Sequence, residues 1–92
     1  MIQSFRCRHT SAVFAGRCPR QFRGIQRLAE RKLQLLDAAQ TLAFLRSPPG
    51  NRLEALSGDR RGQYSIRINA QWRLCFVWTD AGPRDVEIVD YH

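Results

Sequence analysis

The segment QYSIRINAQWRLCFVW, residues 63–78, decides the fold of this chain, because it contains two alternating strands separated by a short polar turn. Its apolar positions are Tyr64, Ile66 and Ile68 in the first strand and Trp72, Leu74, Phe76 and Trp78 in the second. Cross-strand partners share one face of a sheet, so both apolar rows reach the core only if Ile68 lies opposite Trp72. This register pairs Ile66 with Leu74 and predicts a three-residue loop at 69–71, since a two-residue loop would expose one row.

The same register places Arg67 directly opposite Arg73. Two like charges that face each other on a sheet are unfavourable, so the pair has two interpretations. It belongs either to a solvated polar face or to a basic face that binds an anion such as a phosphate. In the second interpretation Ser65 and Asn69, which share that face, supply further hydrogen-bonding groups.

The clearest helix of the sequence spans residues 21–39. Apolar residues recur there every three or four positions, and only one position of the row is polar. The row consists of Phe22, Ile25, Leu28, Ala29, Lys32, Leu36 and Ala39. The other face is mostly basic and exposed, and it carries Arg23, Gln26, Arg27, Glu30, Arg31 and Gln34. The prolines of SPPG, residues 47–50, end the helical half of the chain.

The remaining segments predict further strands and turns. MIQSF (1–5) predicts a short first strand, and residues 6–23 predict a short helix followed by a turn around Pro19. RLEAL (52–56) alternates weakly, SGDRRG (57–62) and TDAGPRD (79–85) predict turns, and VEIVDY (86–91) predicts a last strand. Helices that precede a run of antiparallel strands predict an α+β fold of two layers. The 92 residues are enough for a single domain over 1–92.

The composition indicates a polyanionic partner. The chain has fifteen Lys and Arg against eight Asp and Glu, a net charge of +7, and fourteen of the fifteen cations are Arg. A guanidinium group binds phosphate oxygens through a planar fork. Cys7, Cys18 and Cys75 lack the spacing of a metal site, and no segment has the length of a membrane span. We therefore expect a reduced cytoplasmic protein that needs no metal or other cofactor and does not contact a membrane.

Four motifs in the second half of the chain resemble those of a known toxin family. They are PPGNRLE (48–54), GQYSIRIN (62–69), QWR (71–73) and DYH (90–92), in that order. The segment from Leu33 to His92 is similar to the HigB toxins, the plasmid maintenance system killer proteins, within the RelE and ParE superfamily. The first third is similar to the family only in length and pattern, and Cys7 and Cys18 depart from it.

The resemblance implies a RelE-like fold in which N-terminal helices pack on a curved antiparallel sheet. It also implies a ribonuclease that cleaves mRNA in the A site of the ribosome and so inhibits translation. The implied partners are the ribosome, mRNA and a HigA-type helix-turn-helix antitoxin, and operator DNA is contacted only through that antitoxin.

The residue chemistry is consistent with metal-independent RNA cleavage. This reaction needs activation of the 2′-hydroxyl, stabilisation of charge on the phosphorus, and a proton for the departing 5′-oxygen. The His92 imidazole is the group of the tail suited to proton transfer near neutral pH, and Arg67 and Arg73 would hold the phosphate. Tyr91 could stack on a base, orient the 2′-hydroxyl or transfer a proton, and Asp90 could act as a base or orient His92. Strand alternation separates Tyr91 from the other two, so their convergence requires a bend in the tail.

Further polar residues beside the strands are candidates for RNA contact. They are Asn51, Arg52, Arg60, Arg61, Gln63 and Asn69. A turn or capping role explains Asn51 equally well, and Arg60 and Arg61 are equally consistent with a solvated turn. We expect the aromatic residues Tyr64, Trp72 and Trp78 to fill the core rather than stack on bases, and His9 to be a surface residue.

Two other functions fit the same residues. ParE-type relatives share the fold and inhibit DNA gyrase without catalysis, and a plain nucleic-acid-binding module would need only the basic sheet. The presence of His92 favours the ribonuclease, since neither alternative requires a group that transfers protons.

Overall fold

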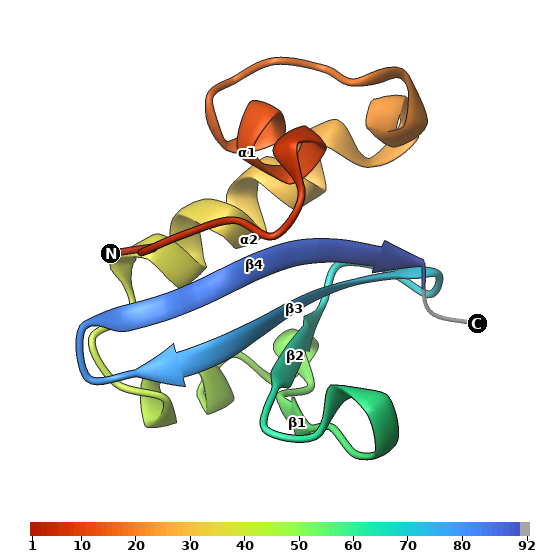
Figure 1. Ribbon diagram of the computed structural model, residues 1–92. Coiled ribbons are helices and arrows are strands. Elements are labelled where there is room, and N and C mark those ends of the chain that lie inside the picture. The colour runs from red at the N-terminus through yellow and green to blue at the C-terminus, as the bar shows by residue number, and fades with distance from the viewer. Residues whose placement is uncertain (91–92) are drawn as a thin grey trace.

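The fold is α+β with two layers, as predicted, and the computed structural model describes residues 1–90. Helices α1 (Arg8–Phe14) and α2 (Gln26–Ala38) lie next to each other beside β4 (Figure 1). The antiparallel sheet has the strand order β1-β2-β3-β4. Its strands are β1 (Glu54–Ala55), β2 (Tyr64–Arg67), β3 (Trp72–Thr79) and β4 (Gly82–Asp90). Short 3₁₀ turns occupy Arg20–Ile25, Ala43–Arg46, Pro49–Asn51 and Gly58–Arg60.

The register predicted for the β2–β3 hairpin is confirmed. Ile66 pairs with Leu74, and the Ile68 amide donates to the Trp72 carbonyl at 2.9 Å. Asn69 shapes the loop, because its Oδ1 accepts the amides of Gln71 and Trp72, both at 2.8 Å. The hairpin therefore turns where both apolar rows can face the helices.

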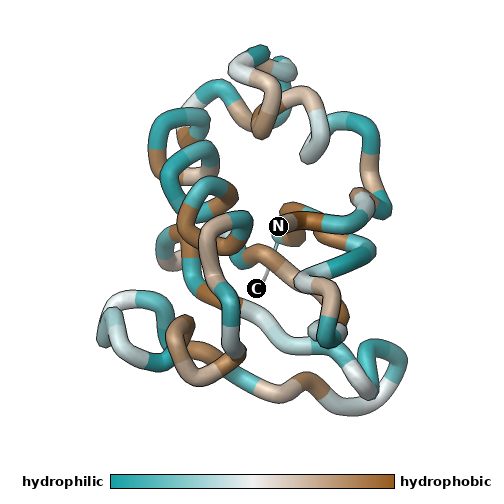
Figure 2. The backbone as a smooth tube through the Cα atoms, turned by 90° about the vertical axis from the view of Figure 1, so that its left-hand side faces the viewer, coloured by the Kyte–Doolittle hydropathy of each residue, from teal (hydrophilic) through white to brown (hydrophobic). Residues whose placement is uncertain are grey.

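The core between α2 and the sheet differs from the predicted helix face at two positions. Ala29, Leu33 and Leu36 are fully buried, whereas Leu28 is 42% exposed and Lys32 is only half-buried. Residues 20–25 form a 3₁₀ turn of about 3.0 residues per turn, and a helix of about 3.6 begins only at Gln26. The buried residues Phe22, Ile25, Ala29, Leu33 and Leu36 nevertheless follow one period of about 3.6 residues, which places Leu33 at the centre of the row and Leu28 and Lys32 at its flank. Figure 2 shows the resulting alternation of hydrophilic and hydrophobic bands along the helical turns.

The N-terminal segment runs along the edge of β4 without forming a regular strand (Figure 1). The Gln3 amide donates to the Pro83 carbonyl at 2.7 Å and the Arg6 amide to the Val86 carbonyl at 3.0 Å. Only Phe5 forms a bridge, in parallel with Val86, so the prediction of a first strand at 1–5 is wrong. Asp85 has a positive φ of 53°, which interrupts the regular edge that a longer strand would need.

The turn before β4 is shorter than predicted, because β4 begins at Gly82 rather than after residue 85. The Thr79 hydroxyl donates to the Gly82 carbonyl at 2.7 Å and accepts the Ala81 amide at 3.2 Å. These two bonds close a tight turn, and residues 82–85 join the sheet.

Replacing Gly82 by alanine is expected to destabilise the protein by about 1 to 3 kcal/mol. Gly82 has a φ of +130°, and an added Cβ would collide with the Met1 carbonyl oxygen. The free energy of unfolding measured in urea tests this prediction. Gly50→Ala is the matched control, because no atom lies within 4 Å of its added Cβ, and it should change that free energy by less than about 0.5 kcal/mol. Equal stability of the two variants would contradict the prediction.

Candidate functional site

Arg73 is held inside the hairpin by groups from three segments. Its residue exposure is 6%, and its Nε donates to the Ser65 Oγ at 2.8 Å. Its Nη2 donates to the Arg52 carbonyl at 2.6 Å and lies 3.6 Å from the Glu54 Oε1. A buried guanidinium with fixed partners is oriented before any ligand binds, so its positive charge has a defined position.

Arg67 lies opposite Arg73 across the β2–β3 ladder, as predicted. Arg67 is half-buried, and its side chain has no hydrogen bond or ion pair with any of residues 1–90. The pKa of Lys32 is lowered, chiefly by burial and then by the positive charges of Arg67 and Arg31. Among residues 1–90, no carboxylate pairs with the positive charge at the end of β2, which favours binding of an anion there.

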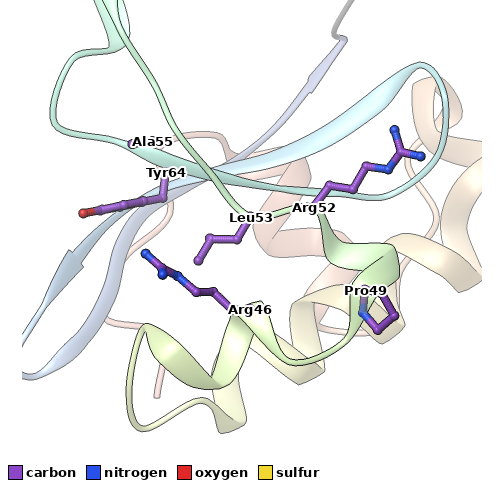
Figure 3. Close-up of a pocket in the computed structure, with 6 residues that line it drawn as sticks. All are labelled: Arg46, Pro49, Arg52, Leu53, Ala55 and Tyr64. Carbon is purple, nitrogen blue, oxygen red and sulfur yellow. The ribbon is translucent and has the colours of Figure 1, made fainter.

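The predicted RNA-contact residues Asn51 and Arg52 are adjacent in sequence but occupy different environments. Asn51 is fully buried, where its Nδ2 donates to the Leu45 carbonyl at 3.1 Å and its Oδ1 accepts from Lys32 Nζ at 2.5 Å. The protein itself satisfies the Asn51 amide, which lies away from any surface that RNA could reach. The Arg52 side chain is exposed and points away from the preceding 3₁₀ turn (Figure 3).

The predicted contacts Arg60 and Gln63 form a cluster with Glu87 at the other end of the hairpin. Arg60 Nη1 donates to the Gln63 Oε1 at 3.1 Å and pairs with the Glu87 Oε1 at 3.2 Å. Arg61 is exposed. Of these three predicted residues, Arg61 therefore has the side chain that is most accessible to a ligand, and Arg60 is restrained by the sheet.

Asp90 ends β4 beside the β2–β3 loop (Figure 1), where its Oδ2 accepts from Gln71 Nε2 at 3.2 Å. It is paired with Trp72, whereas Val89 is paired with Arg73. Because side chains alternate between the faces of a strand, this register directs Asp90 to the side opposite Arg73. The catalytic candidates Tyr91 and His92 lie outside the described residues.

Two acidic residues of this region were not predicted from the sequence. Glu54 shares the face of Arg73, since it pairs with Ser65 across β1 and β2. Glu87 neutralises Arg60. The alternation of RLEAL would have indicated the orientation of Glu54, but only after its pairing partner was known.

The aromatic residues pack as predicted. Tyr64, Trp72 and Trp78 are partly buried against the core. The rings of Phe22 and Trp72 meet edge to face at 5.4 Å, and those of Tyr64 and Phe76 stack at 6.3 Å. The first contact joins the hairpin to the 3₁₀ turn before α2, and the second joins the two strands of the hairpin to each other.

Residues 1–90 contain neither a metal-binding cluster nor a membrane-spanning helix. No group of three or more His, Cys, Asp and Glu side chains in this range is arranged to hold a metal ion. Within the same residues, no helix has the length and apolar character needed to span a bilayer.

Comparison with known proteins places these residues in a family context. Residues 20–92 match the family model described as "RelE-like toxin of type II toxin-antitoxin system HigB". Toxin HigB-1 of Vibrio cholerae serotype O1 is 58% identical over 50 residues, which cover 54% of this chain and 53% of that protein. An uncharacterized protein of Haemophilus influenzae is 40% identical over 54 residues, or 59% and 54% of the two chains. The Endoribonuclease HigB of Proteus vulgaris is 30% identical over 96 aligned positions that cover all of both chains. The chain thus spans about half the length of the first two relatives and the whole length of the third.

Proposed function

Because this chain belongs to the HigB family of RelE-like toxins of type II toxin-antitoxin systems, we propose that it is an endoribonuclease that cleaves mRNA in the ribosomal A site. The reaction proceeds without a metal ion and inhibits translation. The observation that carries this proposal is the pairing of Arg73, whose guanidinium is fixed by hydrogen bonds, with Arg67. The side chain of Arg67 has no ion-pair partner within residues 1–90. The name of the Proteus vulgaris relative, an endoribonuclease, supports the same activity.

The proposed chemistry is an attack of the RNA on its own backbone. A base removes the 2′-hydroxyl proton, the 2′-oxygen forms a bond to phosphorus, and the bond from phosphorus to the 5′-oxygen breaks. The products are a 2′,3′-cyclic phosphate and a 5′-hydroxyl, so atoms and charge balance once an acid protonates the leaving oxygen. Arg67 and Arg73 stabilise the negative charge that accumulates on the phosphoryl oxygens.

The proton transfers fall to groups of the DYH tail. His92 is assigned as the acid, since an imidazolium can donate a proton near neutral pH. Tyr91 and Asp90 remain the two candidates for orienting or deprotonating the 2′-hydroxyl. The cross-strand pairing of Asp90 with Trp72 favours Tyr91 for this role, because the described part of β4 directs Asp90 away from Arg73.

The proposal extends to the partners. A type II system supplies a protein antitoxin, and we assign a HigA-type helix-turn-helix protein to that role. Under this proposal the toxin meets operator DNA only through the antitoxin, and the ribosome presents the mRNA.

Mapping of RNA ends after induced expression tests the proposed function. We expect growth arrest together with new ends at codon-spaced positions in translated mRNA, carrying 2′,3′-cyclic phosphates and 5′-hydroxyls. Ends with 5′-phosphates would indicate hydrolysis by another route. Arrest without cuts, accompanied by loss of DNA supercoiling activity, would support gyrase inhibition, and the absence of arrest would support a passive nucleic-acid-binding module.

A further inference from the structure

A cavity of about 340 Å³ opens beside the edge strand β1, outside the residues assigned to cleavage (Figure 3). Its lining residues are Arg46, Pro49, Arg52, Leu53, Ala55 and Tyr64. They come from the 3₁₀ turns Ala43–Arg46 and Pro49–Asn51, from the segment that leads into β1, and from β2. The volume lies within the range of small-ligand pockets, about 300 to 1,000 Å³.

The lining combines a flat aromatic ring with two arginine side chains. The Tyr64 ring stacks on Phe76 within the protein, and the Arg46 guanidinium points toward Tyr64, whereas the Arg52 side chain extends in the opposite direction (Figure 3). Within residues 1–90, the side chains of Arg46 and Arg52 have no hydrogen-bond or ion-pair partner. The lining contains no carboxylate, and Leu53 and Ala55 supply apolar walls. This set of groups fits a planar base that carries a phosphate.

The pocket is connected to Arg73 through Arg52. The Arg52 backbone has a φ of +46°, a left-handed conformation that is uncommon for a residue with a side chain. In this conformation its carbonyl accepts from Arg73 Nη2 at 2.6 Å, while its side chain belongs to the pocket lining. Arg52 therefore joins the two sites.

The pairing of β1 with β2 also connects the pocket to the Arg73 site. Glu54 pairs with Ser65, and both contact Arg73. Ala55 pairs with Tyr64, and both line the pocket. Successive residues of a strand point to opposite faces, so the pocket and the Arg73 site lie back to back across one edge of the sheet.

We propose that this pocket binds one unpaired nucleotide of the RNA substrate, adjacent in the strand to the nucleotide that is cut. The base stacks against Tyr64, and its phosphate binds Arg46, the guanidinium that points toward that ring (Figure 3). This inference rests on the proposed ribonuclease function, since it assigns the pocket to the same substrate. An acidic peptide would also satisfy the two arginines, but it would leave the aromatic face of Tyr64 unused, so the mixed lining favours a nucleotide.

Titration of the ¹⁵N-labelled protein with adenosine or uridine 5′-monophosphate, followed by NMR, tests the pocket without requiring cleavage. We expect saturable shifts at the amides of Leu53, Ala55 and Tyr64, and smaller shifts there with inorganic phosphate. Arg46→Gln should weaken binding by about tenfold because it removes the phosphate contact, and Tyr64→Leu should do so because it removes the stacking contact.

The control Arg84→Gln removes the same charge from an exposed position of β4 and should leave binding unchanged. Tyr64→Phe, which keeps the ring, should bind nearly as well as the wild type and thus separates stacking from any loss of folding.

Three results would overturn the inference. They are equal shifts with inorganic phosphate and nucleotide, nucleotide-induced shifts confined to the Arg67 and Arg73 face, and protection of the pocket amides by an antitoxin while nucleotides have no effect.

The titration also separates this inference from the proposed function. Nucleotide binding in the pocket of a protein that cuts no mRNA would support the site and contradict the enzyme. Cleavage of mRNA by a protein whose pocket does not bind nucleotides would support the enzyme and contradict the nucleotide site.

Discussion

Replacing His92 by alanine is expected to lower the rate of RNA cleavage by a factor of about 10² to 10⁴, the usual contribution of a general acid or base. The physical reason is that the 5′-oxygen leaves as a high-energy alkoxide unless a proton reaches it as the bond to phosphorus breaks. Single-turnover cleavage of a short mRNA on purified ribosomes measures this rate. The matched control is His9→Ala, which removes the other histidine, in α1, and should retain the wild-type rate.

A modified substrate tests the assigned role of His92 more sharply than the loss of rate. An RNA in which sulfur replaces the bridging 5′-oxygen releases a thiolate, which leaves without a proton. The His92→Ala variant should therefore cleave this RNA at nearly the wild-type rate, whereas a variant that lacks phosphate stabilisation should remain slow. If the sulfur substitution restores nothing in a folded His92→Ala protein, His92 is not the acid.

Replacing Arg73 by glutamine is expected to lower the single-turnover rate by about 10² to 10³, the cost of removing one preorganised donor to a developing negative charge. Arg73 is 6% exposed and its guanidinium is oriented by Ser65 and the Arg52 carbonyl, so no solvent rearrangement is needed when charge accumulates on the phosphate. The same substitution leaves buried acceptors without their donor and should destabilise the fold by about 1 to 3 kcal/mol. Cleavage is therefore compared with thermal unfolding, at a temperature where both proteins are fully folded.

Two further variants separate catalysis by Arg73 from its structural role. Ser65→Ala removes the Oγ contact at 2.8 Å but keeps the guanidinium, so it should cost stability with a much smaller loss of rate. Arg73→Lys keeps the charge but cannot contact Ser65 and the Arg52 carbonyl together, so its rate should lie between those of the wild type and the glutamine variant. A folded Arg73→Gln protein that cleaves at the wild-type rate would refute the assignment.

The sequence predicted the β2–β3 hairpin more closely than any other part of the chain. The two apolar rows satisfy only one register, and the structure has that register, with Arg67 opposite Arg73. The helix at 21–39 was predicted with less accuracy. The helix itself begins only at Gln26, and the buried row contains Leu33 rather than the flanking positions Leu28 and Lys32. A spacing of three or four residues fits several neighbouring rows of a helix, so it does not by itself distinguish the centre of the buried face from its flank.

The candidate site likewise contains residues that the sequence predicted correctly and residues that it did not predict. The sequence predicted Arg67, Arg73 and Ser65 as one face, because a strand repeats every two residues and the hairpin is local. It did not predict Glu54, whose strand has only two residues and pairs with β2 after an irregular path. It left open whether Asn51 contacts RNA or has a turn or capping role, and in the structure the buried Asn51 side chain is hydrogen-bonded to Lys32 and to the Leu45 carbonyl.

The sequence by itself therefore determined the α+β class, the hairpin register and the basic pair, since each depends on short-range periodicity and on burial of apolar residues. Only the tertiary structure decided which of the arginines is buried, which acid faces it, and that a pocket lies behind it. These features depend on where β1 and the preceding 3₁₀ turns meet β2, and that meeting depends on the packing of the whole chain rather than on any local pattern.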